Sequence, residues 1–172
     1  MSTYTPTRSE NRRVPAEMTE PGDSFRASAE ATIRRYFDGC NEADAEKMRS
    51  CFVPEAVHYF PKGAPQGPFV GATAIAEGWQ GAVARLGSSW AIDHVLVDEA
   101  LREAVIEWTH FKSKVGGYLR GDEWYRFDDQ GLITEIRAYY ACPPSEPEHE
   151  LGGFDYEARG YSLGERPKVE SA

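Results

Sequence analysis

The sequence of 172 residues lacks most of the patterns that identify metalloproteins, membrane proteins and secreted proteins. It has three cysteines, widely spaced and in no Cys-x-x-Cys pair, which argues against a zinc site or a dithiol redox site. No apolar run approaches the roughly 18 residues that span a bilayer. The first residues are polar and contain no apolar signal segment. We therefore expect reduced thiols and a cytoplasmic location, with no membrane partner.

Basic residues are also scarce. The chain has 19 Lys and Arg against 28 Asp and Glu, a net charge of −9, which makes it a poor partner for nucleic acid. It contains no glycine-rich phosphate loop, no Gly-x-Ser-x-Gly elbow and no His/Cys/Asp spacing typical of a metal site. Hydrophobic residues make up 41% and aromatic residues 12%. This composition and length are typical of one globular domain.

Periodicity predicts helices in the first half of the chain and strands in the second. Apolar residues in steps of three and four indicate amphipathic helices, the second capped by Asp44 and ended by Pro54, the third ended by Gly87. Strict alternation from 88 to 141 indicates an antiparallel meander. Helices are predicted over 25–40, 45–52 and 72–86, with a turn over 39–43, and strands over 56–60, 90–97, 104–111, 118–127 and 133–140.

The two ends of the chain differ from the domain between them. Residues 1–23 are rich in Pro, Ser, Thr and Arg, and we expect either a flexible arm or an arm that wraps a neighbouring subunit. Residues 142–172 begin with Pro and Glu and then become aromatic. Such rings favour anchoring of this tail, as a lid over a pocket or as a segment between subunits. The domain itself is assigned to residues 24–141.

Three motifs in their order resemble the nuclear transport factor two-like superfamily. They are Arg35-Tyr36-x-x-x-x-Asn41-x-x-Asp44, Gly71-x-x-x-Ile75 and the segment from Asp122 to Arg137. Within it the chain is most similar to the SnoaL-like branch, whose relatives include ketosteroid isomerase, scytalone dehydratase and polyketide cyclases. The resemblance implies a cone-shaped α+β fold, a curved antiparallel sheet wrapped around three helices. It also implies a deep apolar pocket, a homodimer through the outer sheet face, and acid–base chemistry without metal or organic cofactor.

Acid–base chemistry in an apolar pocket needs a carboxylate deprived of water, because burial raises the pKa of an acid toward working pH. The resemblance implies that Glu123 is such an acid and that Tyr36 donates to the substrate oxygen. Glycines at 116, 117 and 121 leave the strand register open, so that Asp122 is the alternative to Glu123. His58 is a candidate proton shuttle, or else a structural histidine.

Two further carboxylates are candidates. Glu107 interrupts an apolar strand, which predicts either a pocket residue or a salt bridge on the outer face at the dimer seam. The resemblance implies a pocket aspartate at Asp38, but a regular helix cannot point both Asp38 and Tyr36 inward, and we favour Tyr36. Ketosteroid isomerase's general base falls at Phe60, which cannot take a proton, so its isomerisation does not transfer directly.

We expect a cofactor-free isomerase, dehydratase, cyclase or epoxide hydrolase acting on a small apolar oxygenated metabolite. Glu123 and Glu107 would be its acid and base, with Tyr36 and Tyr140 orienting the substrate. The alternatives are a non-catalytic module that binds a small molecule or peptide, and a structural dimer whose cavity is filled by its own side chains. Pocket walls, with core packing as the alternative, are predicted at Phe60, Trp79, Thr109, Phe111, Tyr125, Ala138 and Tyr140.

Overall fold

The computed structural model describes residues 25–116 and 118–141, together with residues 153, 155 and 158. The predictions for the N-terminal arm and for the rings of the C-terminal tail lie outside these residues. Among the helices described, none is both long and apolar enough to cross a membrane. Cys40 and Cys51 are buried free thiols.

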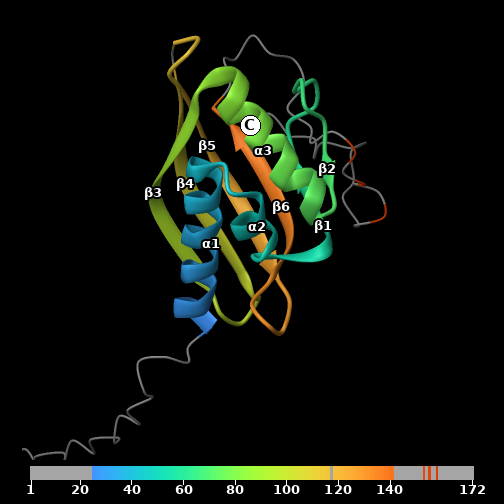
Figure 1. The fold of residues 1–172 in the computed structure, drawn as a ribbon. Helices are drawn as coiled ribbons and strands as arrows, with labels where there is room; N and C mark the ends of the chain where they lie inside the picture. Colours follow the sequence, from blue (N-terminus) through green and yellow to red (C-terminus); the bar gives the residue numbers. More distant parts are fainter. Residues whose placement is uncertain (1–24, 117, 142–152, 154, 156–157, 159–172) are drawn as a thin grey trace, which may run out of the picture.

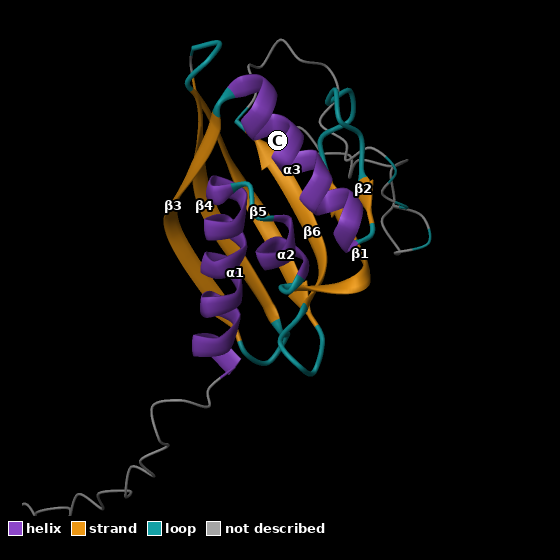
Figure 2. Ribbon diagram, viewed as in Figure 1, coloured by secondary structure: helices purple, strands orange, loops and turns teal. Residues whose placement is uncertain are grey.

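Three helices pack on one face of a curved six-stranded sheet (Figures 1 and 2). The sheet order is β2-β1-β6-β5-β4-β3, and the meander from β3 to β6 is antiparallel as predicted. β1 runs parallel to β6, so the sheet is mixed rather than purely antiparallel. The elements are α1 (Phe25–Glu42), α2 (Ala45–Arg49), β1 (Phe52–Tyr59), β2 (Phe69–Val70), α3 (Ala72–Leu86), β3 (Ser88–Asp98), β4 (Glu103–Lys112), β5 (Tyr118–Phe127) and β6 (Ile133–Tyr140).

Helix α1 buries the predicted stripe but runs further than expected. Tyr36 is 1% exposed, whereas Asp38 lies on the exposed side, so the predicted pocket role of Asp38 is wrong. The expected turn at Gly39 is helical instead. A Cβ on Gly39 would lie 2.8 Å from Cγ of Met48, so the glycine lets α2 pack closely against α1. The chain turns instead at Ala43, which has a φ of 55°.

Helix α2 begins as predicted and ends sooner. The Asp44 side chain accepts hydrogen bonds from the backbone N–H groups of Glu46 and Lys47, at 3.0 and 2.9 Å. The prediction that Pro54 ends this helix is wrong, because the helix stops at Arg49 and Pro54 lies inside β1. The pairing of β1 with β6 is irregular there, and proline fits because such a position needs no ladder donor.

Helix α3 and the meander agree with the sequence prediction. Gly87 ends α3 in the left-handed conformation, with φ 64°, and its N–H bonds to the carbonyl of Val83 at 3.0 Å. The core lies between the helices and the inner face of the sheet. Burial of each large apolar side chain there contributes about 1.5–3 kcal/mol. Its most buried members include Ile33, Tyr36, Met48, Ile75, Ile106, Tyr125, Ile133 and Ile136.

Candidate functional site

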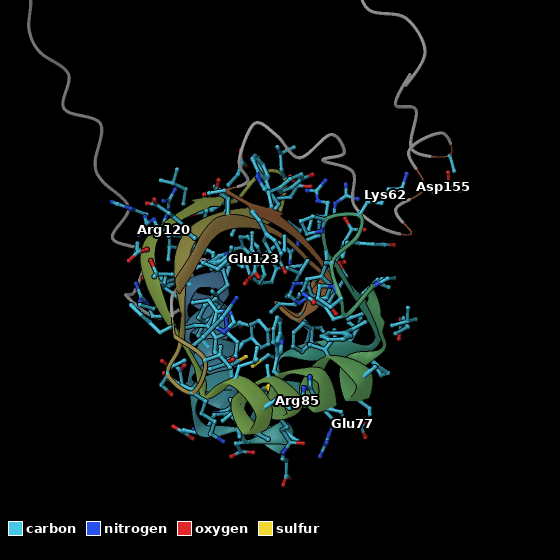
Figure 3. All side chains as sticks on the ribbon, turned by 90° about the horizontal axis from the view of Figure 1, so that it is seen from above. Lys62, Glu77, Arg85, Arg120, Glu123 and Asp155 are labelled. Carbon is cyan, nitrogen blue, oxygen red and sulfur yellow. The ribbon has the colours of Figure 1, made fainter. Side chains whose placement is uncertain are left out.

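A cavity of about 360 Å³ lies between α3 and the inner face of the sheet. This volume is within the usual range for small-molecule pockets. Figure 3 looks down on the site, with Glu123 on the sheet side and Arg85 on the side of α3. Its apolar walls are mostly aromatic: Phe60, Phe69, Trp79, Trp90, Trp108, Leu119 and Tyr140. Its polar lining side chains are Gln66, Arg85, His110, Lys112 and Glu123.

Strand β5 points Glu123 into this cavity. Successive residues of β5 alternate between buried and exposed, and Glu123 is 6% exposed while Asp122 faces outward and is exposed. The pairing of β4 with β5 passes through Gly121 without a shift, since Trp108 pairs with Gly121 and Ile106 with Glu123. The register therefore favours Glu123 and places Asp122 outside the site.

Two neighbours hold the Glu123 carboxylate. The Tyr125 hydroxyl donates to Oε2, and Oε1 lies 3.5 Å from Nε2 of His58. A buried carboxylate without such partners would be strongly destabilising. Burial, with the Glu123 charge next, raises the pKa of Tyr125 well above its usual value. Tyr125 thus stays protonated and donates permanently, from beneath the cavity rather than from its wall.

His58 is fully buried and is oriented by two residues of the helices. Its Nδ1 lies 3.4 Å from the Tyr36 hydroxyl, and Nε1 of Trp79 donates to that hydroxyl at 2.5 Å. An indole N–H only donates, so the Tyr36 oxygen accepts from Trp79 and its own hydrogen can go to Nδ1. When the Tyr36 hydrogen points to Nδ1, the opposite ring nitrogen, Nε2, faces Glu123. At 3.5 Å the two groups are in electrostatic contact, without the geometry of a hydrogen bond.

Ala138 explains how His58 and Glu123 can meet. They lie on β1 and β5, and β6 runs between these strands. Ala138 pairs with Glu123, and Ile136, two residues before it, pairs with His58. The Ala138 methyl group is fully buried and small, which leaves room for the two longer side chains to converge above it. Ala138 therefore supports the site from the sheet and does not line the cavity.

Glu107 lies on the opposite face of the sheet from the cavity. It accepts from Arg120 and lies 2.8 Å from Nδ1 of His94. Hydrogen bonds from His94 and then from Arg120 hold the pKa of Glu107 below its usual value. The prediction of a Glu123–Glu107 acid–base pair is wrong, and the alternative of an outer-face salt bridge is confirmed.

Thr109 and Phe111 follow Glu107 onto the outer face, so their predicted place in the pocket is also wrong. The Thr109 hydroxyl bonds to Oδ2 of Asp93 at 2.7 Å, and Phe111 is 47% exposed. Both faces of β4 carry apolar side chains, so its period of two does not reveal which face is covered. In the structure the covered face of β4 is that of Trp108 and His110, since these two side chains line the cavity.

Sequence reasoning missed several residues of the cavity. His110 stacks on Trp90 at 4.5 Å between ring centroids, and its Nε2 lies 2.8 Å from Oγ of Ser88. Burial, followed by the charge of Lys112, lowers the pKa of His110 to about 4. The grouping of His110 with Trp108 on one face of β4 was the available signal. Gln66, which bonds to the Tyr140 hydroxyl at 2.8 Å, comes from a loop without periodicity.

The arrangement suits proton transfer inside a hollow with mostly aromatic walls. Glu123 offers Oε1 next to an imidazole, and the cavity leads to it between aromatic rings. Burial raises the pKa of Tyr36 well above its usual value, which keeps that hydroxyl protonated. Of the predicted residues, Tyr36, His58, Glu123 and Tyr125 come together, with Phe60, Trp79 and Tyr140 around them. Across the described part of the chain, no cluster of His, Cys, Asp and Glu could hold a metal ion.

Comparison with known proteins identifies the family. The sequence profile of the SnoaL-like domain matches residues 33–136. A protein of unknown function with a cystatin-like fold from Methylobium petroleophilum PM1 is 53% identical, with a TM-score of 0.79, over 83% of this chain and 96% of that one. No curated protein matches the chain.

Two more distant structures share the fold. An NTF2-like protein of unknown function from Mesorhizobium loti has a TM-score of 0.59 at 21% identity, over 70% of this chain and 96% of that one. A putative polyketide cyclase from Sinorhizobium meliloti has a TM-score of 0.54 at 20% identity, over 64% and 97%. With its NTF2-like α+β cone and the matched profile, the chain belongs to the SnoaL-like domain family.

Proposed function

We propose that this protein is an acid–base enzyme that moves a proton on a small, apolar, oxygenated molecule bound in the cavity. One observation carries the proposal: the buried carboxylate of Glu123 faces an aromatic hollow and lies beside an imidazole. The name of the putative polyketide cyclase supports the same class of chemistry. Isomerisation, dehydration, cyclisation and epoxide opening all require such a proton transfer.

The residues have separate roles in this proposal. Glu123 exchanges the proton through Oε1, because Oε2 is occupied by the Tyr125 hydroxyl. His58 stabilises the negative charge on Glu123 through Nε2, and Tyr36 holds the imidazole at Nδ1 on the other side of the ring. The hydroxyl of Tyr140 lies at the cavity wall and orients the substrate oxygen. The aromatic walls lower the polarity around Glu123, which strengthens these interactions.

The test is a screen of small ketones, epoxides and hydroxy compounds for turnover, followed by Glu123→Gln. We expect the rate to fall by about 10²–10⁴-fold, the usual contribution of a positioned acid or base. Glu107→Gln is the matched control, because it makes the same chemical change on the outer face of the sheet. Circular dichroism checks that both variants fold. Turnover by the Glu123 variant at the wild-type rate contradicts the proposal.

A non-catalytic binding module is the second candidate, favoured by the same aromatic cavity. It predicts tight ligand binding, no turnover by the wild type, and binding that survives Glu123→Gln. The open volume of about 360 Å³ speaks against a purely structural dimer with a filled cavity. Homodimer formation through the outer sheet face, where Phe111, Trp124 and Tyr139 are exposed, stays a prediction for sedimentation analysis.

A further inference from the structure

We propose that the ligand of this cavity carries an anionic head group, held by Arg85 and Lys112 at the end remote from Glu123. This inference rests on the proposed function in using the same cavity, and it specifies the class of substrate. The ligand would be an apolar ring system with a carboxylate or phosphate at one end. Its oxygenated, reacting end would reach Glu123.

Arg85 lies on the face of α3 that forms the cavity wall. Gly78, Trp79, Ala82 and Arg85 all line the cavity, in steps typical of one helical face. Arg85 is six residues beyond Trp79, which corresponds to about 9 Å along the helix axis. Trp79 belongs to the group around His58, since it donates to Tyr36. The helix thus leads from the buried hydrogen-bonded group to a cation in its last turn.

Lys112 occupies the matching position on the sheet. Trp108, His110 and Lys112 follow one another on the inner face of β4, and all three line the cavity. The backbone N–H groups of Ser113 and Lys114 bond to the carbonyls of Gly87 and Leu86, at 3.1 and 3.0 Å. These bonds fasten the end of β4 to the end of α3. Arg85 and Lys112 therefore belong to the same end of the cavity.

Within the described part of the chain, no carboxylate compensates the charges at this end. Among the residues that the structure describes, neither Arg85 nor Lys112 forms an ion pair. This contrasts with Arg102, Arg120, Arg126 and Arg137, each of which lies within 4 Å of a carboxylate. His110, the next residue along the inner face from Lys112, is neutral at pH 7 because its pKa is about 4. Arg85 is exposed and Lys112 is half-buried, and two cations without a carboxylate partner among the described residues favour an anionic ligand.

The pairing of β4 with β5 gives the distance that a ligand must span between Glu123 and Lys112. Glu123 pairs with Ile106 of β4, six residues before Lys112, so their Cα positions differ by about 20 Å along the strand. The Glu123 carboxylate bonds to Tyr125, which lies on the side away from Lys112, so only the side chain of Lys112 can shorten this distance. Repulsion by Glu123 keeps the anionic group at the far end. Two fused rings with a short acidic arm fit within this distance.

Calorimetric titration with three probes tests the proposal: 2-naphthylacetate, 2-naphthyl phosphate and the neutral 2-naphthylacetamide. We expect at least one anion to bind about tenfold more tightly than the amide at low salt, as two partly solvated charge contacts allow. The preference should shrink in high salt. Which anion binds better tells a carboxylate site from a phosphate site.

The double variant Arg85→Gln/Lys112→Gln should lose this preference and keep its affinity for the amide, which shows that the cavity is intact. Arg34→Gln/Arg49→Gln removes the same charge from exposed positions on α1 and α2 and should keep the preference. Glu123→Gln should also keep it, so the result does not depend on turnover. Equal binding of anions and amide by the wild type, or a preference that survives the loss of Arg85 and Lys112, overturns the proposal.

Discussion

His110 couples the stability of the cavity wall to pH. Its pKa is about 4 in the folded protein against 6.5 for the free side chain, because burial disfavours the imidazolium. The unfolded chain therefore binds more protons between these values, and stability rises with pH across this interval. The contribution of His110 is complete above about pH 6.5 and is lost as the pH falls toward 4.

We expect the wild type to lose roughly 1–2 kcal/mol more than His110→Gln between pH 6.5 and pH 4.5. This is less than the full shift would give, because the ring borders a cavity that water can enter. Urea unfolding at several pH values measures the difference. Parallel pH profiles for wild type and His110→Gln would show that the ring stays solvated.

Single residues differ in how far the sequence predicts them. Glu123 was predictable because it shares the period of Tyr125 and Phe127, and that period continues through Gly121. Glu107 was not, because an acidic residue among apolar neighbours suits a pocket and an ion-paired outer face equally well. Its partners Arg120 and His94 lie on neighbouring strands. Only the pairing of strands brings them together.

At the scale of the element, β5 depends on a residue without a side chain. A Cβ on Gly121 would collide with the carbonyl oxygen of Tyr139 and would lie 2.7 Å from Cζ2 of Trp108. Gly121→Ala should lower the free energy of unfolding by about 1–3 kcal/mol, the usual cost of overpacking, and should displace the Trp108 ring from the cavity wall. Thermal unfolding and tryptophan fluorescence measure the two effects.

Gly116→Ala is the comparison for this variant. A Cβ on Gly116 would meet open space, and the cost there is the backbone strain of a φ of 79°, about 1 kcal/mol. Gly116→Ala should leave the tryptophan fluorescence unchanged. If Gly121→Ala unfolds like the wild type, β5 and β6 are more loosely packed than the structure indicates.

The helices and strands also differ in how far the sequence predicts them. The four meander strands and α3 carry long periodic patterns, and their bounds agree with the sequence within a few residues. The start of β1 was misplaced because Pro54 normally ends a helix, and its place at an irregular pairing depends on β6, far along the chain. The two residues of β2 form no pattern at all. Periodicity in the sequence therefore predicts the elements that carry a long local pattern, but not strands whose bounds depend on distant partners.

At the scale of the whole molecule, we expect the open cavity to lower the free energy of unfolding and to provide the space that a ligand needs. Ala82 lines it from α3, and Ala82→Leu would place three further carbon atoms in the open space. We expect the free energy of unfolding to rise by up to about 1 kcal/mol, as for other cavity-filling changes. Binding of 2-naphthylacetate should become undetectable. Urea unfolding and calorimetry measure the two quantities on the same samples.

Ala29→Leu is the control for this variant, since Ala29 is fully buried in α1 and does not border the cavity. The added carbons have no space there, and we expect a loss of about 1–3 kcal/mol. A loss of similar size for Ala82→Leu would mean that the cavity is occupied by side chains in solution.

The parallel pairing of β1 with β6 has a consequence for biosynthesis. A ribosome makes the His58 segment early, yet this strand finds its long neighbour only when residues 133–140 have emerged. Until then the edge of β1 that pairs with β6 has no neighbouring strand, because β2 pairs with the other edge. Such an edge attracts chaperones or other nascent chains. A polypeptide whose translation stops before β6 therefore cannot bring the imidazole of His58 beside the carboxylate of Glu123.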